Sequence, residues 1–141
     1  MKVLRLFTDG AARGNPGPAA LGVVIEDADG MRLAGRQRYL GVMTNNRAEY
    51  LALIEGLRMV SEWHPDRVEV FLDSKLVVEQ LAGRFRVKNA ELAPLHQRAL
   101  ELLASFPDIS LSHVERDRNR GADGLANRAL DEQKQKAAGR G

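Results

Sequence analysis

The chain has 141 residues; 44% are hydrophobic and 28% charged, and 21 basic against 19 acidic side chains give a net charge of +2. This composition is typical of one globular domain and excludes a disordered chain, collagen or a coiled coil. Because there is no cysteine and no apolar run of the roughly 20 residues that cross a bilayer, disulfide frameworks, thiol catalysis and a membrane partner are excluded as well.

The N-terminal third predicts a meander of three strands. Stretches rich in strand-forming side chains occupy residues 3–9, 21–26 and 32–39. A dense turn segment, GAARGNPGP, separates the first two, and Asp29-Gly30 is a hairpin signal between the second and third. The apolar period then becomes helical from Ala48 to about Glu62, with capping candidates at Thr44, Asn45 and Asn46.

The remaining elements alternate between strands and helices. Strands are expected at residues 67–73 and 109–114, and helices at 74–82, 91–105 and 122–133. The order βββ-α-β-α-α-β-α predicts an α/β fold, a five-stranded mixed sheet with helices on both faces. A crossover helix makes the first and fourth strands parallel neighbours. We expect one domain over residues 1–133 and a disordered tail over 134–141.

Acidic residues stand at the ends of several elements. Asp9 and Asp73 end the two strands expected to be parallel neighbours, so both belong to the sheet edge where α/β folds hold ligands. Taken singly, Asp9 is compatible with a turn, and Asp73 and Asp123 with helix caps. Glu49 lies on the apolar stripe of its helix, where burial without a partner costs several kcal/mol. Four converging carboxylates would repel one another, and Mg²⁺ or Mn²⁺ is the natural compensation.

Four segments resemble, in order, the motifs of type 1 ribonuclease H. They are TDGAARGNPGP at residues 8–18, TNNRAE at 44–49, LDS at 72–74 and NRGADGLA at 119–126. The resemblance covers residues 3–130 and implies the ribonuclease H-like fold. It implies hydrolysis of the RNA strand of an RNA–DNA hybrid with two Mg²⁺ ions, Mn²⁺ being an alternative, and products with 5′-phosphate and 3′-hydroxyl ends. The implied catalytic and metal-binding residues are Asp9, Glu49, Asp73 and Asp123.

The resemblance also implies contacts to the substrate. Asn15, Asn45 and Asn46 match family positions that contact the minor groove of the hybrid, where an amide can both donate and accept. Thr44 matches a position that holds a DNA phosphate. Arg118 and Asn119, in the loop before the last motif, complete the expected set.

The chain departs from many family members in two places. The loop at residues 115–120 carries no histidine; we expect Arg118 to neutralise phosphate charge there, although an arginine cannot act as a general base. The segment at residues 80–91 is too short for the long basic insertion of some members, which predicts weaker substrate binding. The three cations at positions 84, 86 and 88 are either a remnant of that insertion or a solvated loop.

Three other functions fit the same residues less well. A nuclease for another substrate would not need the GNPG and TNNRAE segments. A hybrid-binding module without catalysis would gain nothing from four repelling carboxylates, and a kinase-like fold would need a second domain. The sequence therefore predicts a cytoplasmic, monomeric endoribonuclease whose partner is an RNA–DNA hybrid.

Overall fold

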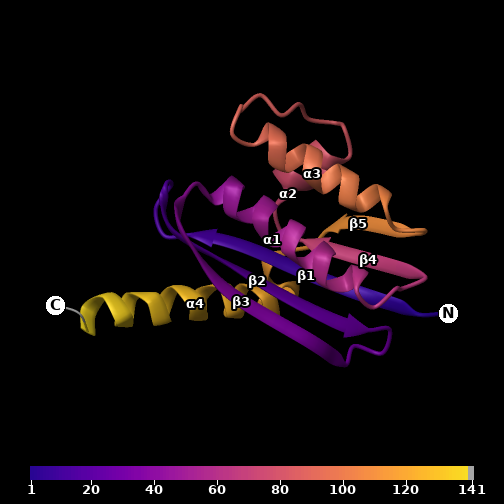
Figure 1. Ribbon diagram of the computed structural model, residues 1–141, viewed down its shortest axis with the longest axis horizontal. Helices are drawn as coiled ribbons and strands as arrows, with labels where there is room; N and C mark the ends of the chain where they lie inside the picture. The colour runs from indigo at the N-terminus through magenta and orange to yellow at the C-terminus, as the bar shows by residue number, and fades with distance from the viewer. Residues whose placement is uncertain (140–141) are drawn as a thin grey trace.

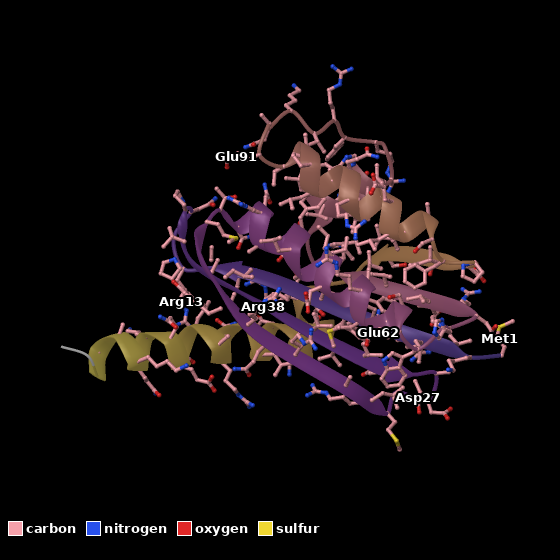
Figure 2. All side chains as sticks on the ribbon, in the orientation of Figure 1. Met1, Arg13, Asp27, Arg38, Glu62 and Glu91 are labelled. Atoms are coloured by element: carbon pink, nitrogen blue, oxygen red, sulfur yellow. The ribbon has the colours of Figure 1, made fainter. Side chains whose placement is uncertain are left out.

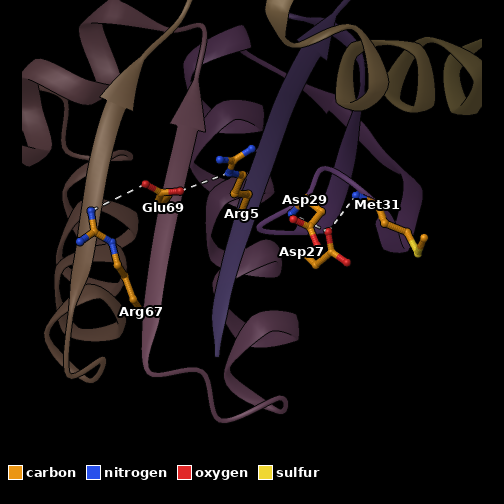
Figure 3. Close-up of polar contacts among 6 residues, drawn as sticks. All are labelled: Arg5, Asp27, Asp29, Met31, Arg67 and Glu69. Carbon is orange, nitrogen blue, oxygen red and sulfur yellow. Dashed lines mark hydrogen bonds and ion pairs between the residues drawn. The ribbon is translucent and has the colours of Figure 1, made fainter. Parts of the chain in front are cut away.

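The first 43 residues form a long antiparallel meander in the computed structural model, which describes residues 1–139 (Figure 1). Its strands are β1 (Val3–Ala12), β2 (Gly17–Asp27) and β3 (Arg32–Met43). They extend three or four residues beyond the predicted ends, because the residues flanking the turn segment also pair: Ala12 lies opposite Ala19, and Gly17 opposite Met43. Asp27 closes the β2–β3 turn by accepting from the backbone N–H groups of Asp29 and Met31, each at 2.9 Å (Figure 3).

The rest of the chain completes the sheet and covers it. The elements are α1 (Asn45–Ser61), β4 (Arg67–Leu72), α2 (Lys75–Leu81), α3 (Ala93–Ala104), β5 (Ile109–His113), a 3-10 turn η1 (Arg116–Arg118) and α4 (Arg120–Gly139). The strand order is β3-β2-β1-β4-β5, and β1 runs parallel to β4 with Thr8 opposite Leu72. The predicted mixed five-stranded sheet and the parallel β1–β4 pair are confirmed.

Two glycines on adjacent strands let helices approach opposite faces of the sheet. A Cβ on Gly10 would lie 2.2 Å from the carbonyl carbon of Ala48 in α1, and a Cβ on Gly22 would lie 1.9 Å from the carbonyl oxygen of Ala122 in α4. Gly22 pairs with Asp9, so it shares a face with Asp9 and not with Gly10. The starts of α1 and α4 are therefore pressed onto the two faces of the same strand end (Figure 1).

The main core lies between α1 and the central strands. Leu6 of β1, Val70 of β4 and Leu53 and Leu57 of α1 are all fully buried in it. A smaller cluster of Ala20, Ala129 and Leu130 lies under α4. On the face that α1 does not cover, Glu69 of β4 bridges Arg5 of β1 and Arg67 (Figure 3). Within residues 1–139, no helix has the length and hydropathy needed to span a membrane.

The C-terminal segment differs from the prediction. Instead of a disordered tail from residue 134, helix α4 continues to Gly139. The physical reason is that Leu130 anchors the helix on β2, and the following sequence, Lys-Gln-Lys-Ala-Ala, consists of strong helix formers. The last two residues of the expected tail, 140–141, lie outside the described part of the chain.

The edge strand β3 is tied to α1 by a buried carboxylate. Glu55, only 8% exposed, accepts from the guanidinium groups of Arg36 and Arg38, the latter at 3.2 Å. Figure 2 labels Arg38 on this strand. A buried carboxylate needs such partners, because its desolvation is costly when it is unpaired.

Replacing Arg36 and Arg38 together by alanine is therefore expected to lower the free energy of unfolding by about 3 kcal/mol. Urea unfolding of the parent and the double variant measures this loss. Adding Glu55→Leu to the double variant should restore much of the stability, since it removes the unpaired charge. A loss below about 1 kcal/mol, the range of exposed ion pairs, would contradict the assignment.

Candidate active site

Four carboxylates from four different elements surround one cavity. Asp9 is on β1, Glu49 is in the first turns of α1, Asp73 follows β4 directly and Asp123 is in the first turn of α4. All four line a cavity of about 280 Å³. Oxygens of Asp9, Glu49 and Asp73 lie within 4.8 Å of one another, and Asp123 stands outside this group of three.

The close approach of α1 to β1 explains why a glycine follows Asp9. Because Gly10 has no side chain, the backbone at Ala48 and Glu49 can pack directly on the strand. Its N–H then donates to Oε1 of Glu49 at 2.9 Å, which fixes the carboxylate beside Asp9. The TDG and TNNRAE segments therefore pack directly against each other at Gly10 and Glu49.

Burial and mutual repulsion dominate the electrostatics of this cavity. Burial, reinforced by the negative charges of Glu49 and Asp73, holds the pKa of Asp9 far above its usual range. Burial also raises the pKa of Glu49, against the opposing effects of Asp9, the Gly10 N–H and the positive charge of Arg116. The oxygen Oε2 of Glu49 is buried and has no hydrogen-bond partner among residues 1–139.

These features fit a divalent cation. An orphaned buried carboxylate oxygen and two further carboxylates within 4.8 Å are the all-oxygen ligand set that hard cations such as Mg²⁺ prefer. A cation there would also counter the negative charges of Glu49 and Asp73, which add to the effect of burial in raising the pKa of Asp9. The residues present are therefore compatible with the metal that the sequence predicts.

Two side-chain amides support carboxylates of the cavity. Nδ2 of Asn119 donates to the carbonyl oxygen of Thr8 at 3.0 Å and to Oδ2 of Asp73 at 3.3 Å. Nδ2 of Asn127 donates to the carbonyl oxygen of Asp123 at 3.0 Å and to its Oδ1 at 3.2 Å. Sequence reasoning missed Asn127, although its position four residues after Asp123 on one helix is a usable signal.

The expectation that Asn119 contacts the substrate does not agree with its burial. Only 1% of the residue is exposed, because it lies beneath the cavity against the end of β1. A side chain that is already donating to two protein acceptors inside the fold cannot reach a duplex bound outside. Asn119 is a buried residue that supports the carboxylates from inside the fold.

The expected minor-groove contacts lie where the β1–β2 loop meets the start of α1. Oδ1 of Asn15 accepts from the N–H of Asn45 at 3.0 Å, and Oδ1 of Asn45 accepts from the N–H of Ala12 at 3.2 Å. Both oxygens are thereby occupied, which leaves the two amide nitrogens to donate to a ligand. Thr44 caps α1 by accepting from a backbone N–H in its first turn, and Asn46 is the second residue of the helix.

In the loop before α4, the arginine that reaches the carboxylate cavity is Arg116, not Arg118; Arg13, from the turn between β1 and β2, lines the cavity as well. Arg116 lines the cavity, and its charge lowers the pKa of Glu49. Arg118 is exposed and does not line the cavity. The cause is the 3-10 turn η1, in which residues two apart lie on different faces. The sequence presented both arginines in one loop and gave no means of choosing between them.

The basic segment between α2 and α3 lies apart from the cavity. The guanidinium of Arg84 is paired with Glu79 of α2, whereas Arg86, Lys88 and the half-exposed ring of Phe85 are on the surface. One of the three cations is thus already neutralised by a carboxylate, which reduces the positive charge that this segment can offer to a nucleic acid.

Comparison with known proteins places the chain in a family. The model of a family described as reverse transcriptase-like matches residues 7–129. Ribonuclease HI of Halobacterium salinarum is 45% identical over 126 residues, which are 89% of this chain and 63% of that protein. Mycobacterial relatives match 98% of this chain, which corresponds to only 38% of their length. The chain thus spans less than two thirds of these curated relatives.

Two solved structures share the fold along their whole length. The N-terminal ribonuclease H domain of a Mycobacterium tuberculosis protein is 42% identical, with a TM-score of 0.91 and coverage of 97% of this chain and 99% of that one. LC11 ribonuclease H1, isolated from compost and solved in complex with an RNA/DNA hybrid, is 38% identical, with a TM-score of 0.86 and coverage of 92% and 98%. By sequence, fold and motif order, the chain belongs to the type 1 ribonuclease H family.

Proposed function

We propose that the chain is an endoribonuclease that hydrolyses the RNA strand of RNA–DNA hybrids with divalent cations, Mg²⁺ in the first place. The observation that carries the proposal is the cluster of Asp9, Glu49 and Asp73, whose oxygens lie within 4.8 Å of one another and include one buried oxygen without a partner. A family member of 38% identity has been solved with a hybrid bound, which supports the same substrate here. A cytoplasmic location and a monomeric state stay predictions from the sequence.

Asp9, Glu49, Asp73 and Asp123 would hold the cations. When bound, divalent cations supply an activated water and neutralise charge at the scissile phosphate. The protein's part is positioning: Gly10 fixes Glu49 through its backbone N–H, and Asn127 fixes Asp123. Mn²⁺, which also prefers oxygen ligands, would be an alternative metal.

Recognition of the hybrid falls to the surface beside this cavity. Asn15, Asn45 and Asn46 are proposed to contact the minor groove, where base-edge acceptors and 2′-hydroxyl groups are displayed. Thr44 is proposed to hold a phosphate of the DNA strand. Asn45 also lines the carboxylate cavity, so groove contacts and the reacting phosphate would be adjacent.

Arg116 is proposed to neutralise charge on the phosphate at the cavity, the task that the sequence assigned to Arg118. Arg116→Ala is expected to lower kcat about a hundredfold, because it removes a cation from the site where charge develops. Arg118→Ala should lower it much less, since that side chain does not line the cavity. Steady-state kinetics of both variants decide the assignment, and an equal or larger effect at Arg118 would reverse it.

The substrate assignment is tested with labelled duplexes that contain one, two or four consecutive ribonucleotides in one strand, beside all-DNA duplex. We expect Mg²⁺-dependent cleavage of the four-ribonucleotide duplex and none of duplex DNA, because a site that hydrogen-bonds 2′-hydroxyls rejects a strand that lacks them. The single-ribonucleotide duplex should be cut very poorly. Efficient cutting at the single ribonucleotide would contradict a type 1 specificity, and cleavage of duplex DNA would contradict the proposed substrate.

A further inference from the structure

Asn119 is a buried residue that hydrogen-bonds Asp73 and the backbone of Thr8, Arg116 and Asp123. Besides its bonds to Thr8 and Asp73, Asn119 receives the backbone N–H of Asp123 on its carbonyl oxygen at 3.0 Å. Its own N–H donates to the carbonyl oxygen of Arg116, also at 3.0 Å. The residue therefore connects β1, β4, η1 and the first turn of α4 at a single point.

The side chain of Asn119 can be oriented in one way only. Both of its partners, the Thr8 carbonyl and the Asp73 carboxylate, are acceptors, so the NH₂ group must face them. The opposite atom, Oδ1, is buried without a partner among residues 1–139. An unpaired buried acceptor costs free energy. The two hydrogen bonds made by the amide nitrogen are therefore the interactions that offset this cost.

The carboxylate of Asp73 is held by a side chain that comes from a distant part of the chain. Glu49 is held by the Gly10 backbone N–H, and Asp123 by Asn127 from its own helix. Asp73 follows the end of β4, and in residues 1–139 the Asn119 amide is the protein group that hydrogen-bonds its carboxylate. Because the same nitrogen also bonds the carbonyl of Thr8, which precedes Asp9, the amide sets the Asp73 carboxylate relative to the Asp9 strand end.

We propose that Asn119 is a positioning residue that holds Asp73 against the end of β1, and so builds the cation site from two separate strands before any substrate is bound. This inference rests on the proposed function for its catalytic consequence. Its consequence for cation binding is independent of the substrate. Residues that orient metal ligands in this manner change metal affinity by about 10- to 100-fold when they are replaced.

The test measures Mn²⁺ binding by calorimetry in the absence of nucleic acid, for the parent, Asn119→Ala and Asn119→Asp. We expect both variants to bind Mn²⁺ about tenfold or more weakly. In Asn119→Asp the charged oxygen would face two acceptors, which repels Asp73 instead of holding it. With hybrid as substrate, kcat should fall by a similar factor while KM changes less than threefold.

The control is Gln80→Ala, which removes another buried amide of the same chain. Gln80 is 7% exposed and accepts from the Tyr50 hydroxyl at 2.7 Å, away from the carboxylate cavity. This variant should lose stability in urea and bind Mn²⁺ within twofold of the parent. Comparison of this variant with Asn119→Ala distinguishes a general loss of stability from displacement of the Asp73 carboxylate.

A double-variant cycle with Asp73→Asn keeps the proposal testable if a single variant is poorly folded. When Asn119 acts through Asp73, adding Asn119→Ala to Asp73→Asn should cause little further loss of Mn²⁺ affinity. Additive losses, or Mn²⁺ affinity in Asn119→Ala equal to that of the parent, would overturn the proposal. If the Asn119 variants bind Mn²⁺ more weakly as expected but the parent leaves hybrids uncut, the proposed function is contradicted and the positioning role is not.

Discussion

Asp73→Asn is expected to abolish turnover while binding of the hybrid persists or improves. The substitution keeps the shape of the side chain but removes one of the three carboxylates that lie within 4.8 Å of one another. Loss of a metal ligand should exceed the roughly 100-fold cost of losing a residue that merely supports one. Removal of a negative charge from a surface that receives phosphates should not weaken binding. Single-turnover cleavage and fluorescence anisotropy measure the two quantities separately.

Asp108→Asn is a matched control for this experiment. Asp108 directly precedes β5, and β4 pairs with β5 from Val68 opposite Ile109, so Asp108 lies at the opposite end of the sheet from Asp73. Its carboxylate is exposed and only 3.8 Å from Arg67. This variant should cleave as the parent does. Activity of Asp73→Asn within tenfold of the parent, with the same metal requirement, would contradict the site.

Asp9→Asn should make the metal-free protein more stable even though it removes activity. Asp9 is 5% exposed and faces the negative charges of Glu49 and Asp73. At neutral pH the unfolded chain has this carboxyl ionised. The metal-free folded protein must either ionise it beside two negative charges or keep it protonated, and both alternatives lower the free energy of unfolding. An amide avoids both, and we expect a gain of about 2 kcal/mol at pH 7.5, the size typical of one strongly shifted group. Thermal unfolding in EDTA should show a Tm higher by several degrees.

The pH dependence of this gain has a definite sign. The folded-state pKa of Asp9 is raised above the unfolded value of 3.8, so the folded protein binds the proton more tightly than the unfolded chain. The free energy of unfolding of the metal-free parent should therefore decrease as the pH rises above about 4. The difference between Asp9→Asn and the parent should be small at pH 4 and should grow steadily as the pH rises to neutrality and above. Mg²⁺ should raise the Tm of the parent and have a smaller effect on the variant. A parent that is more stable than Asp9→Asn in EDTA at pH 7.5 would contradict this account.

Local patterns in the sequence predicted most of the fold. Period-two stretches and turn signals gave the three-stranded meander, and the crossover helix placed β1 beside β4 in parallel. The burial of Glu49 also followed from a local pattern, because its position on the apolar stripe of α1 required it to face the sheet. These predictions depend on residues that are close together in the sequence, and the spacing of apolar residues within one helix or strand shows which face is buried.

The features that the sequence did not predict depend on contacts between distant segments. The choice between Arg116 and Arg118 is made by the turn η1, and the burial of Asn119 by its packing against a strand more than one hundred residues earlier. The pairing of Glu55 with the arginines of β3 likewise needs the sheet to be assembled. Motif resemblance assigned Asn119 to substrate contact, but only the three-dimensional arrangement shows that its side chain is buried beneath the carboxylates.

The proposed nuclease activity is tested directly by incubating an RNA–DNA hybrid, labelled on its RNA strand, with and without Mg²⁺ and then analysing the product ends. We expect internal cuts in the RNA strand that require the cation, carry 5′-phosphate and 3′-hydroxyl ends, and vanish in Asp73→Asn. Products with 2′,3′-cyclic phosphate ends, cleavage that persists in EDTA, or an intact RNA strand in the presence of Mg²⁺ or Mn²⁺ would contradict the proposed activity.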